Sequence, residues 1–154
     1  MAELIIPYKP REHQLKVHDL LVGKRFAVVV AHRRFGKTVA ALNHLIRESL
    51  LNQKEAPRYA YIAPTYGQAK RVAWDYFKHY AAPITKTTNE ADLMVELVNG
   101  AKIMLFGSDN ADAMRGLGFN GVYLDEYGDF KPSVWGNVVR PCLSDRLGWA
   151  VFGG

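Results

Sequence analysis

The spacing of apolar residues predicts an alternation of strands and helices. The run 25–30 is rich in β-branched residues and is typical of a buried parallel strand, and residues 58–63 predict a second one. Between them, apolar residues recur at helical spacing: Val39, Leu42, Leu45, Ile46 and Leu50. Residues 8–14 open an earlier helix, which we expect to stop near Gly23.

A stripe of apolar side chains marks the helix that follows the second strand. Its members fall at i, i+3, i+4, i+7, i+8 and i+11: Ala69, Val72, Ala73, Tyr76, Phe77 and Tyr80. We interpret the stripe as core rather than as a base-stacking surface. Trp74 lies off the stripe, where it could face a partner.

The second half of the chain begins with a predicted β-hairpin. Apolar residues recur over 92–98 and 102–106, and Asn99-Gly100 between them favours a tight turn in which both residues have φ > 0. Further strands are predicted at 122–125 and 149–152, with a helix from Pro132 to about Pro141. The predicted fold is α/β: one domain with a mainly parallel sheet, helices on both faces and an antiparallel hairpin.

Residues 31–38 carry the clearest chemical signal, A-x-x-x-x-G-K-T. This is a P-loop with Ala in place of the first Gly, and it stands where the motif must stand, between a strand and a helix. Backbone N–H groups of the loop and the helix dipole would bind phosphate, Lys37 would reach the β- and γ-phosphates, and Thr38 would ligate Mg²⁺. The candidate ATP-binding residues of the loop are Arg33, Arg34, Phe35, Gly36, Lys37 and Thr38.

Asp125 and Glu126 follow an apolar strand and match the second half of an ATPase site. Asp125 would hold Mg²⁺ and Glu126 would polarise the attacking water. An isolated Asp-Glu pair at the end of a strand is usually just solvated, and the functional interpretation depends on the P-loop upstream. A glutamate directly after the aspartate favours water as nucleophile, so a small-molecule kinase is less consistent with the sequence.

Gln14 is a candidate adenine-reading residue, because a side-chain amide can both donate and accept hydrogen bonds. Taken alone, a glutamine in this place is more typical of an exposed helix surface.

Composition narrows the class of protein. The net charge is +5, and the excess lies in the first 38 residues, which hold eight Lys or Arg and three Asp or Glu. Part of that charge surrounds the presumed triphosphate, so it is weak evidence for DNA binding.

No apolar run approaches the ~20 residues of a membrane span, and the start of the chain does not read as a signal peptide. The single cysteine, Cys142, excludes an internal disulfide and is consistent with a reducing cytoplasm, and the five histidines have no zinc-ligand spacing.

Taken together, these features resemble the ATPase domain of the large terminase subunit of tailed bacteriophages, the motor that packages viral DNA into a procapsid. The resemblance covers nearly the whole chain. It rests on the order of these segments: Tyr8 with His13-Gln14, His32 to Thr38, Ala63 to Ala69, Asn99-Gly100, Arg115-Gly116, Val122 to Tyr127, and Trp149 to Gly154.

The resemblance implies roles for matching residues. Gln14 would read adenine, Arg33 would sense or stabilise the γ-phosphate, and Arg115 would be offered as an arginine finger to the ATP of a neighbouring subunit. It also implies a homo-oligomeric ring in the full-length protein, double-stranded viral DNA, portal protein and small terminase subunit as partners, and a place in the host cell cytoplasm.

The resemblance further implies that residues 1–154 are an incomplete N-terminal ATPase domain. The family's C-terminal nuclease domain has no counterpart in this sequence, so we do not expect DNA cutting. The coupling motif that follows the last strand would be represented by Gly153-Gly154 alone. Two alternatives remain open: a helicase-like P-loop ATPase acting on nucleic acid, and a catalytically inactive fragment that binds nucleotide.

Overall fold

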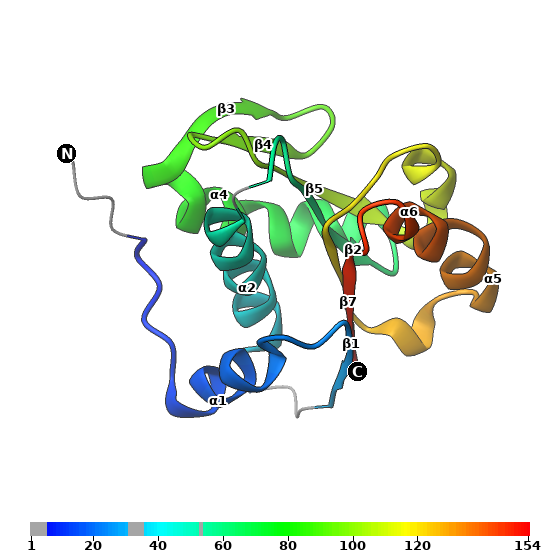
Figure 1. Cartoon of the computed structure of the whole chain (residues 1–154), viewed down its shortest axis with the longest axis horizontal. Coiled ribbons are helices and arrows are strands. Elements are labelled where there is room, and N and C mark those ends of the chain that lie inside the picture. The colour runs from blue at the N-terminus through cyan, green and yellow to red at the C-terminus, as the bar shows by residue number, and fades with distance from the viewer. Residues whose placement is uncertain (1–5, 31–35, 53) are drawn as a thin grey trace.

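The protein has three layers, with a sheet between two sets of helices (Figure 1). The structure is a computed structural model that describes residues 6–30, 36–52 and 54–154. Within these residues, seven strands form one sheet in the order β1-β7-β6-β2-β5-β4-β3. Helices α2 and α4 cover one face, while α5 and α6 cover the other (Figure 1).

The first half of the chain alternates helix and strand. Its elements are α1 (Glu12–Leu21), β1 (Phe26–Val29), α2 (Lys37–Leu51), β2 (Arg58–Ala63), α3 (Tyr66–Gln68), the π-helix η2 (Ala69–Ala73), α4 (Trp74–Ala81) and the 3₁₀-helix η3 (Ala82–Ile84).

The second half supplies the other strands. Its elements are β3 (Thr85–Asn89), β4 (Met94–Leu97), β5 (Lys102–Gly107), the 3₁₀-helix η4 (Ser108–Met114), β6 (Gly121–Leu124), the 3₁₀-helix η5 (Tyr127–Asp129), α5 (Pro132–Val134), the π-helix η6 (Trp135–Val139), α6 (Arg140–Ser144) and β7 (Trp149–Gly153).

The sheet confirms the predicted α/β class. Strands β1, β7, β6, β2 and β5 run parallel, while β4 pairs antiparallel with both β5 and β3. The sequence did not predict β3, whose residues Thr85–Asn89 are mostly polar and exposed. It is the outer strand of the antiparallel half of the sheet.

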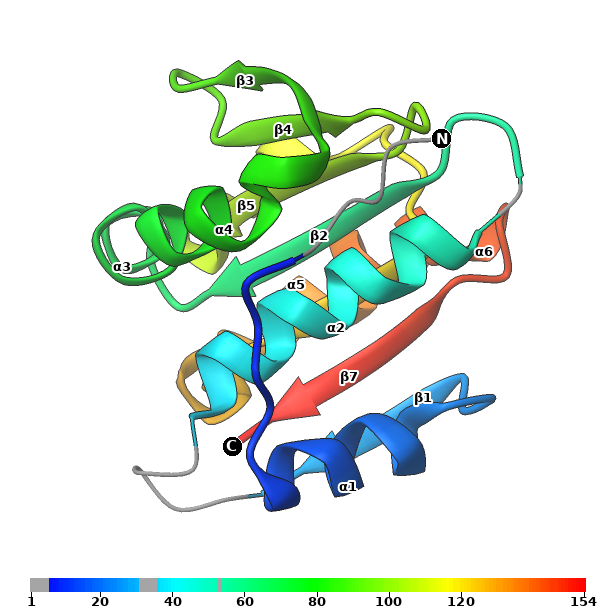
Figure 2. The same ribbon diagram turned by 90° about the vertical axis from the view of Figure 1, so that its left-hand side faces the viewer.

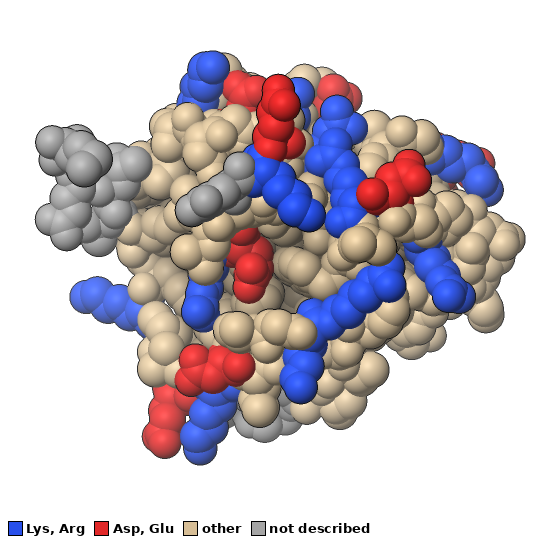
Figure 3. Space-filling model, viewed as in Figure 1, with Lys and Arg blue, Asp and Glu red and all other residues tan. Residues whose placement is uncertain are grey.

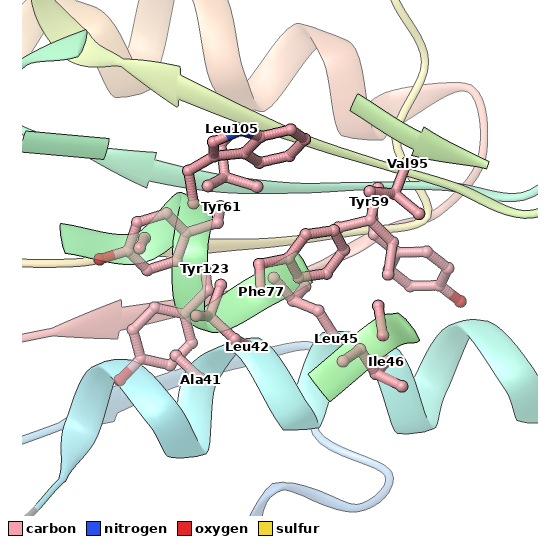
Figure 4. Packing of buried hydrophobic residues seen from close by; sticks show 14 of the residues in the cluster. Ala41, Leu42, Leu45, Ile46, Tyr59, Tyr61, Phe77, Val95, Leu105 and Tyr123 are labelled. Atoms are coloured by element: carbon pink, nitrogen blue, oxygen red, sulfur yellow. The ribbon is translucent and has the colours of Figure 1, made fainter. Parts of the chain in front are cut away.

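The core lies on both faces of the sheet. Because side chains alternate along a strand, Tyr59 and Tyr61 of β2 face α2, while Ala60 and Ile62 face the opposite side. The larger cluster packs Leu42, Leu45 and Ile46 of α2 against β2, with Phe77 of α4 beside them (Figure 4). Burial on both faces explains why β2 reads as a continuous apolar run.

The prediction that residues 25–30 form a buried strand is wrong in one respect. Strand β1 forms, but it lies at the edge of the sheet and pairs only with β7 among the described strands. Ala27 and Val29 pack against the core, whereas Phe26, Val28 and Val30 are 47%, 71% and 82% exposed. Local apolar pattern does not encode strand order, so it could not distinguish an edge strand from a central one.

A π-helix changes which side of the α3–α4 helical run is buried. The backbone N–H of Trp74 donates to the carbonyl of Ala69, five residues earlier, which adds one residue to that turn. A residue corresponds to about 100° of helix rotation, so the buried face shifts. Trp74 is buried at 2% exposure, while Val72 and Tyr76 are each 49% exposed, which contradicts the predicted stripe at these three positions.

Two smaller predictions also need correction. Gly100 has φ +88° but Asn99 does not have positive φ, and the hydrogen bond from the N–H of Leu97 to the carbonyl of Ala101 closes a loop of three residues rather than two. The helix that begins at Pro132 continues through Pro141 to Ser144. The π-helix η6 precedes Pro141, and Pro is tolerated at the start of a new α-helical segment.

Phe77 and Tyr76 provide a test of the shifted helix face. We expect Phe77→Ala to lower the free energy of unfolding by about 3–5 kcal/mol, because its fully buried ring leaves a cavity in the main core. Tyr76→Ala, at the adjacent half-exposed position, should cost less than about 1 kcal/mol. Denaturant unfolding of the two variants would measure both, and equal losses would contradict the observed register.

Candidate nucleotide-binding site

The candidate residues gather where the parallel strands end. Strands β1, β7 and β6 are neighbours and point the same way, so their carboxyl ends meet at one edge of the sheet. Helix α2 begins at this edge, close to the C-terminal end of the chain (Figure 2). Ligands of open α/β sheets bind outside the carboxyl ends of the strands.

Gly36 caps the start of α2 in a conformation that favours glycine. Its φ is +79°, and a Cβ there would lie 2.6 Å from Nε2 of Gln14 and 2.7 Å from Nη2 of Arg11. The first turn of α2 carries no acidic side chain, and the unpaired N–H groups of a helix start attract anions. Arg33, Arg34 and Phe35 lie outside the described residues, and their proposed contacts with ATP stay predictions.

Lys37 is directed at the end of the neighbouring strand. Its ammonium group donates a hydrogen bond to the carbonyl oxygen of Gly154, which directly follows β7. This contact brings together two segments that are 117 positions apart in sequence. The P-loop lysine and the Gly153-Gly154 segment therefore lie side by side at the candidate site.

Thr38 and Asp125 are brought into direct contact. The hydroxyl of Thr38 donates to Oδ2 of Asp125 at 3.1 Å, and the side chain of Asp125 is 6% exposed. The backbone N–H of Asp125 donates to the carbonyl of Ile62, which fixes the start of the turn after β6. A hydroxyl and a carboxylate are suitable oxygen ligands for Mg²⁺, which takes its remaining ligands from water and phosphate, so this pair fits the predicted metal site.

Tyr61 is part of this arrangement and was missed by the sequence analysis. Its hydroxyl donates to Oδ2 of Asp125 at 2.5 Å. Burial and the adjacent carboxylate hold the pKa of Tyr61 well above its usual value, so it is a protonated donor. The pairing of β2 with β6 places Tyr61 opposite Tyr123, two residues before Asp125. That register was the missing information, because nothing in the sequence indicates which strand neighbours β6.

Gln14 joins the site through α1. Its Nε2 donates to the carbonyl of Gly36 at 3.1 Å, and its Oε1 accepts from the backbone N–H of Arg11 at 2.9 Å. Gln14 is 4% exposed, so the interpretation of this residue as an ordinary surface glutamine is wrong. Its contact with Gly36 places its amide directly beside the start of α2.

A buried histidine pair anchors α1 against α2. The rings of His18 and His44 stack 5.2 Å apart with Nδ1 atoms 3.0 Å from each other, and the hydroxyl of Tyr8 lies 2.9 Å from Nε2 of His18. Burial, followed by the proximity of His18 and Arg47, lowers the pKa of His44 to about 3. Burial and the nearby Arg47 also lower the pKa of His18, so the pair is uncharged at neutral pH, which suits its position between the helices that carry Gln14 and Lys37.

Glu126 is exposed and lies directly after Asp125 in a strained backbone conformation. Its φ and ψ are 51° and 48°, in the left-handed region that side-chain-bearing residues rarely adopt. Such outliers cost of order 1–3 kcal/mol and cluster at functional sites. The side chain is exposed to solvent, and it follows Asp125, which contacts Thr38.

Arg115 contacts residues outside the candidate nucleotide-binding site. Its Nε donates to Oδ1 of Asp112 at 2.6 Å and its Nη1 to the carbonyl of Asn137 at 3.3 Å. Pro141, four residues after Asn137, has no N–H to offer that carbonyl. The side chain is 56% exposed, so Arg115 is a surface residue held by local partners and is not brought to the candidate ATP-binding residues of its own chain.

Neither a membrane helix nor the cavity beside the hairpin bears on this site. The described residues include no helix that is both long and apolar enough to cross a membrane. A cavity of about 470 Å³ lies between the hairpin and η4, lined by residues such as Tyr66, Met94 and Phe106. It is lined by none of the candidate ATP-binding residues.

Comparisons with known proteins, by sequence and by structure, all identify terminase large subunits. The family model described as "Terminase large subunit, T4likevirus-type, N-terminal" matches residues 29–143. The chain is 28% identical over 168 aligned residues to the terminase large subunit of Thermus phage G20c, covering 96% of this chain and 34% of that protein. The chain thus spans about a third of the length of this curated relative.

Solved structures give the same result. The large terminase ATPase domain of Thermus phage P74-26 is similar with a TM-score of 0.77 and 27% identity, over 97% of this chain and 66% of that one. The large terminase of another thermophilic bacteriophage, in complex with ATP-gamma-S, has a TM-score of 0.73 at 17% identity, over 94% of this chain and 38% of that one, and supports the fold. With a family match that spans most of its residues, the chain belongs to the terminase large subunit family, as a representative of the family's N-terminal region.

Proposed function

We propose that this chain is the ATP-hydrolysing motor part of a viral DNA-packaging terminase, coupling hydrolysis of Mg-ATP to translocation of double-stranded DNA into a procapsid. The observation that carries the proposal is the contact between Thr38 and Asp125 beside the start of α2. It supports the proposal because it brings together two residues, 87 positions apart in sequence, that we assign to the two halves of a P-loop ATPase site.

Each residue of the candidate site has a separate role in ATP binding or hydrolysis. The N–H groups at the start of α2 and the ammonium group of Lys37 bind the phosphates, which replace the Gly154 carbonyl as its acceptor. Thr38 and Asp125 hold Mg²⁺, whose charge offsets that of the β- and γ-phosphates. Glu126 accepts a proton from the attacking water, and Arg33 stabilises the γ-phosphate. Gln14 contacts adenine with the amide atoms that now bond Gly36 and Arg11.

ATP as the substrate has independent support. The large terminase of the second thermophilic phage was solved with ATP-gamma-S and also with ADP. A carboxylate immediately after the metal-binding aspartate favours transfer to water over transfer to a small molecule. The reaction proposed for this chain is therefore ATP hydrolysis, and DNA cutting is not assigned to it.

The partners follow from family membership rather than from charge. On the face seen in Figure 3, Lys and Arg side chains are scattered and interspersed with Asp and Glu, so no single basic patch dominates it. We propose double-stranded viral DNA, the portal protein and the small terminase subunit as partners, and a homo-oligomeric ring in the full-length protein. The proposed place of action is the cytoplasm of the host cell.

Lys37 tests the nucleotide site. We expect Lys37→Ala to weaken Mg-ATP binding at least tenfold, because the variant loses a charge-assisted hydrogen bond worth about 1.5–3 kcal/mol. Titration with a fluorescent ATP analogue would measure the change. Lys16→Ala is the control, since Lys16 is a well-exposed lysine in α1, paired only loosely with Glu12 at 3.8 Å. Identical titration curves for Lys37→Ala and the unmodified protein would refute the P-loop assignment.

A further inference from the structure

We propose that Tyr61 is a positioning residue that holds the carboxylate of Asp125 ready for Mg²⁺. The inference deepens the proposed function and rests on it. In the structure, Asp125 receives two hydroxyl donors from different elements: Thr38 from α2 and Tyr61 from β2. Both donate to Oδ2, so these two bonds leave Oδ1 of the same carboxylate for other ligands.

The two donors have different roles. Thr38 is itself a candidate ligand, and its hydroxyl must share its lone pairs with the metal. Tyr61 is in the middle of the sheet, one strand away from Asp125, and contacts the carboxylate with its hydroxyl hydrogen. A hydrogen bond to a charged acceptor fixes the direction of that acceptor, and partners of this kind govern how tightly a ligand holds its metal.

Burial makes the Tyr61 hydroxyl hard to replace. Tyr61 is 3% exposed and Asp125 6% exposed. The ring of Tyr61 stacks on that of Tyr123, with centroids 6.4 Å apart and an angle of 10° between the planes. Figure 4 shows the two rings above α2 with their hydroxyl groups pointing toward the same end of the sheet. With so little exposed surface, water has restricted access to the position of a lost hydroxyl, and the carboxylate would lose orientation.

Tyr123 is a matched control for this idea. It lies opposite Tyr61 in the adjacent strand and on the same face of the sheet, and it is also 3% exposed. The structure gives it no hydrogen bond to Asp125; its hydroxyl is beside Gly153, where a Cβ would come within 3.0 Å. Tyr123→Phe therefore removes the same atom from an equivalent buried ring, without removing a donor to Asp125.

The experiment separates metal binding from nucleotide binding. The affinity of the chain for ADP is measured in EDTA and then at increasing Mg²⁺ concentration, together with thermal unfolding in the absence of nucleotide. For Tyr61→Phe we expect an affinity in EDTA within about twofold of the unmodified protein, and a roughly tenfold higher Mg²⁺ concentration for half-maximal enhancement of binding. Tyr123→Phe should match the unmodified protein in both measurements.

Each other outcome has a defined meaning. An unchanged Mg²⁺ requirement in Tyr61→Phe overturns the inference while leaving the proposed function intact. Equal losses in both variants, or a Tyr61→Phe protein that is unfolded at the assay temperature, overturn it in favour of a packing role for the ring pair. If the unmodified chain shows no Mg²⁺-dependent ADP binding, the proposed function fails, and the inference fails with it.

Discussion

Replacing Glu126 by Gln is expected to lower ATP turnover by roughly 10²–10⁴ while ATP binding stays as strong or becomes stronger. The amide keeps the shape of the side chain but cannot accept a proton from water. Because Glu126 is exposed and is not a donor or acceptor to Lys37, Thr38 or Asp125 in the structure, its loss should not disturb the groups proposed to bind ATP. ATP binding is measured in this chain. Turnover is measured in a version of the protein that extends past Gly154 and hydrolyses ATP.

The backbone at Glu126 makes Gln the right substitution. The residue sits at φ 51° and ψ 48°, so a change to Gly would relieve strain and alter stability together with chemistry. Gln bears the same cost as Glu and isolates the role of the carboxylate. Asp129→Asn is the matched control, because Asp129 is the next exposed carboxylate, three residues on in η5. Near-normal turnover in Glu126→Gln combined with a large loss in Asp129→Asn would move the catalytic role to Asp129.

Individual helices, strands and turns were predictable because each has a characteristic spacing of apolar residues or characteristic turn residues. The α/β alternation, the strand 58–63 and the hairpin around Gly100 follow from apolar spacing and turn residues, and the structure confirms all three. What apolar spacing cannot give is the order of strands. That order puts β1 at the edge with Val28 exposed, and it puts Tyr61 next to Asp125.

The π-helix at 69–73 shows a second kind of limit. Helical spacing assumes 3.6 residues per turn throughout, so one added residue rotates the positions that follow it, although Phe77 stays buried as predicted. Trp74 is buried for this reason, and its indole N–H donates to Glu90 at 2.6 Å instead of facing a partner. No residue in the segment Ala69–Ala73 is a Pro or Gly that would mark the irregularity in the sequence.

Residues of the candidate site could be identified from the sequence, but the contacts between them could not. Motif spacing identified Lys37, Thr38 and Asp125, and the structure places Thr38 and Asp125 in contact beyond the carboxyl end of β6. Gln14 was left open between two interpretations, and its burial against Gly36 was not evident from a helix with a mixed polar and apolar pattern. The family resemblance suggested a role for Arg115 that the structure of one chain does not test, because the proposed target lies on another subunit.

Mixed subunits provide the test for Arg115. We propose that it reaches the triphosphate of a neighbouring subunit, where an arginine finger can be worth 10³ or more in rate. Arg115→Ala subunits keep an intact ATP site, and Glu126→Gln subunits keep an intact finger. Mixed in the full-length protein, the two should recover part of the ATPase activity that each has lost alone, because some sites then combine a working carboxylate with a working finger.

The local partners of Arg115 supply the control for that experiment. If the arginine acts only through its ion pair with Asp112, then Asp112→Ala should reproduce the loss seen in Arg115→Ala. A pair this exposed contributes about 0–1 kcal/mol, so for a finger we expect Asp112→Ala to keep most of the activity, the arginine being released rather than removed. No recovery at any mixing ratio, with mixed assembly shown independently and with equal losses in Asp112→Ala and Arg115→Ala, would establish Arg115 as a residue that fastens η4 to the carbonyl of Asn137 within its own chain.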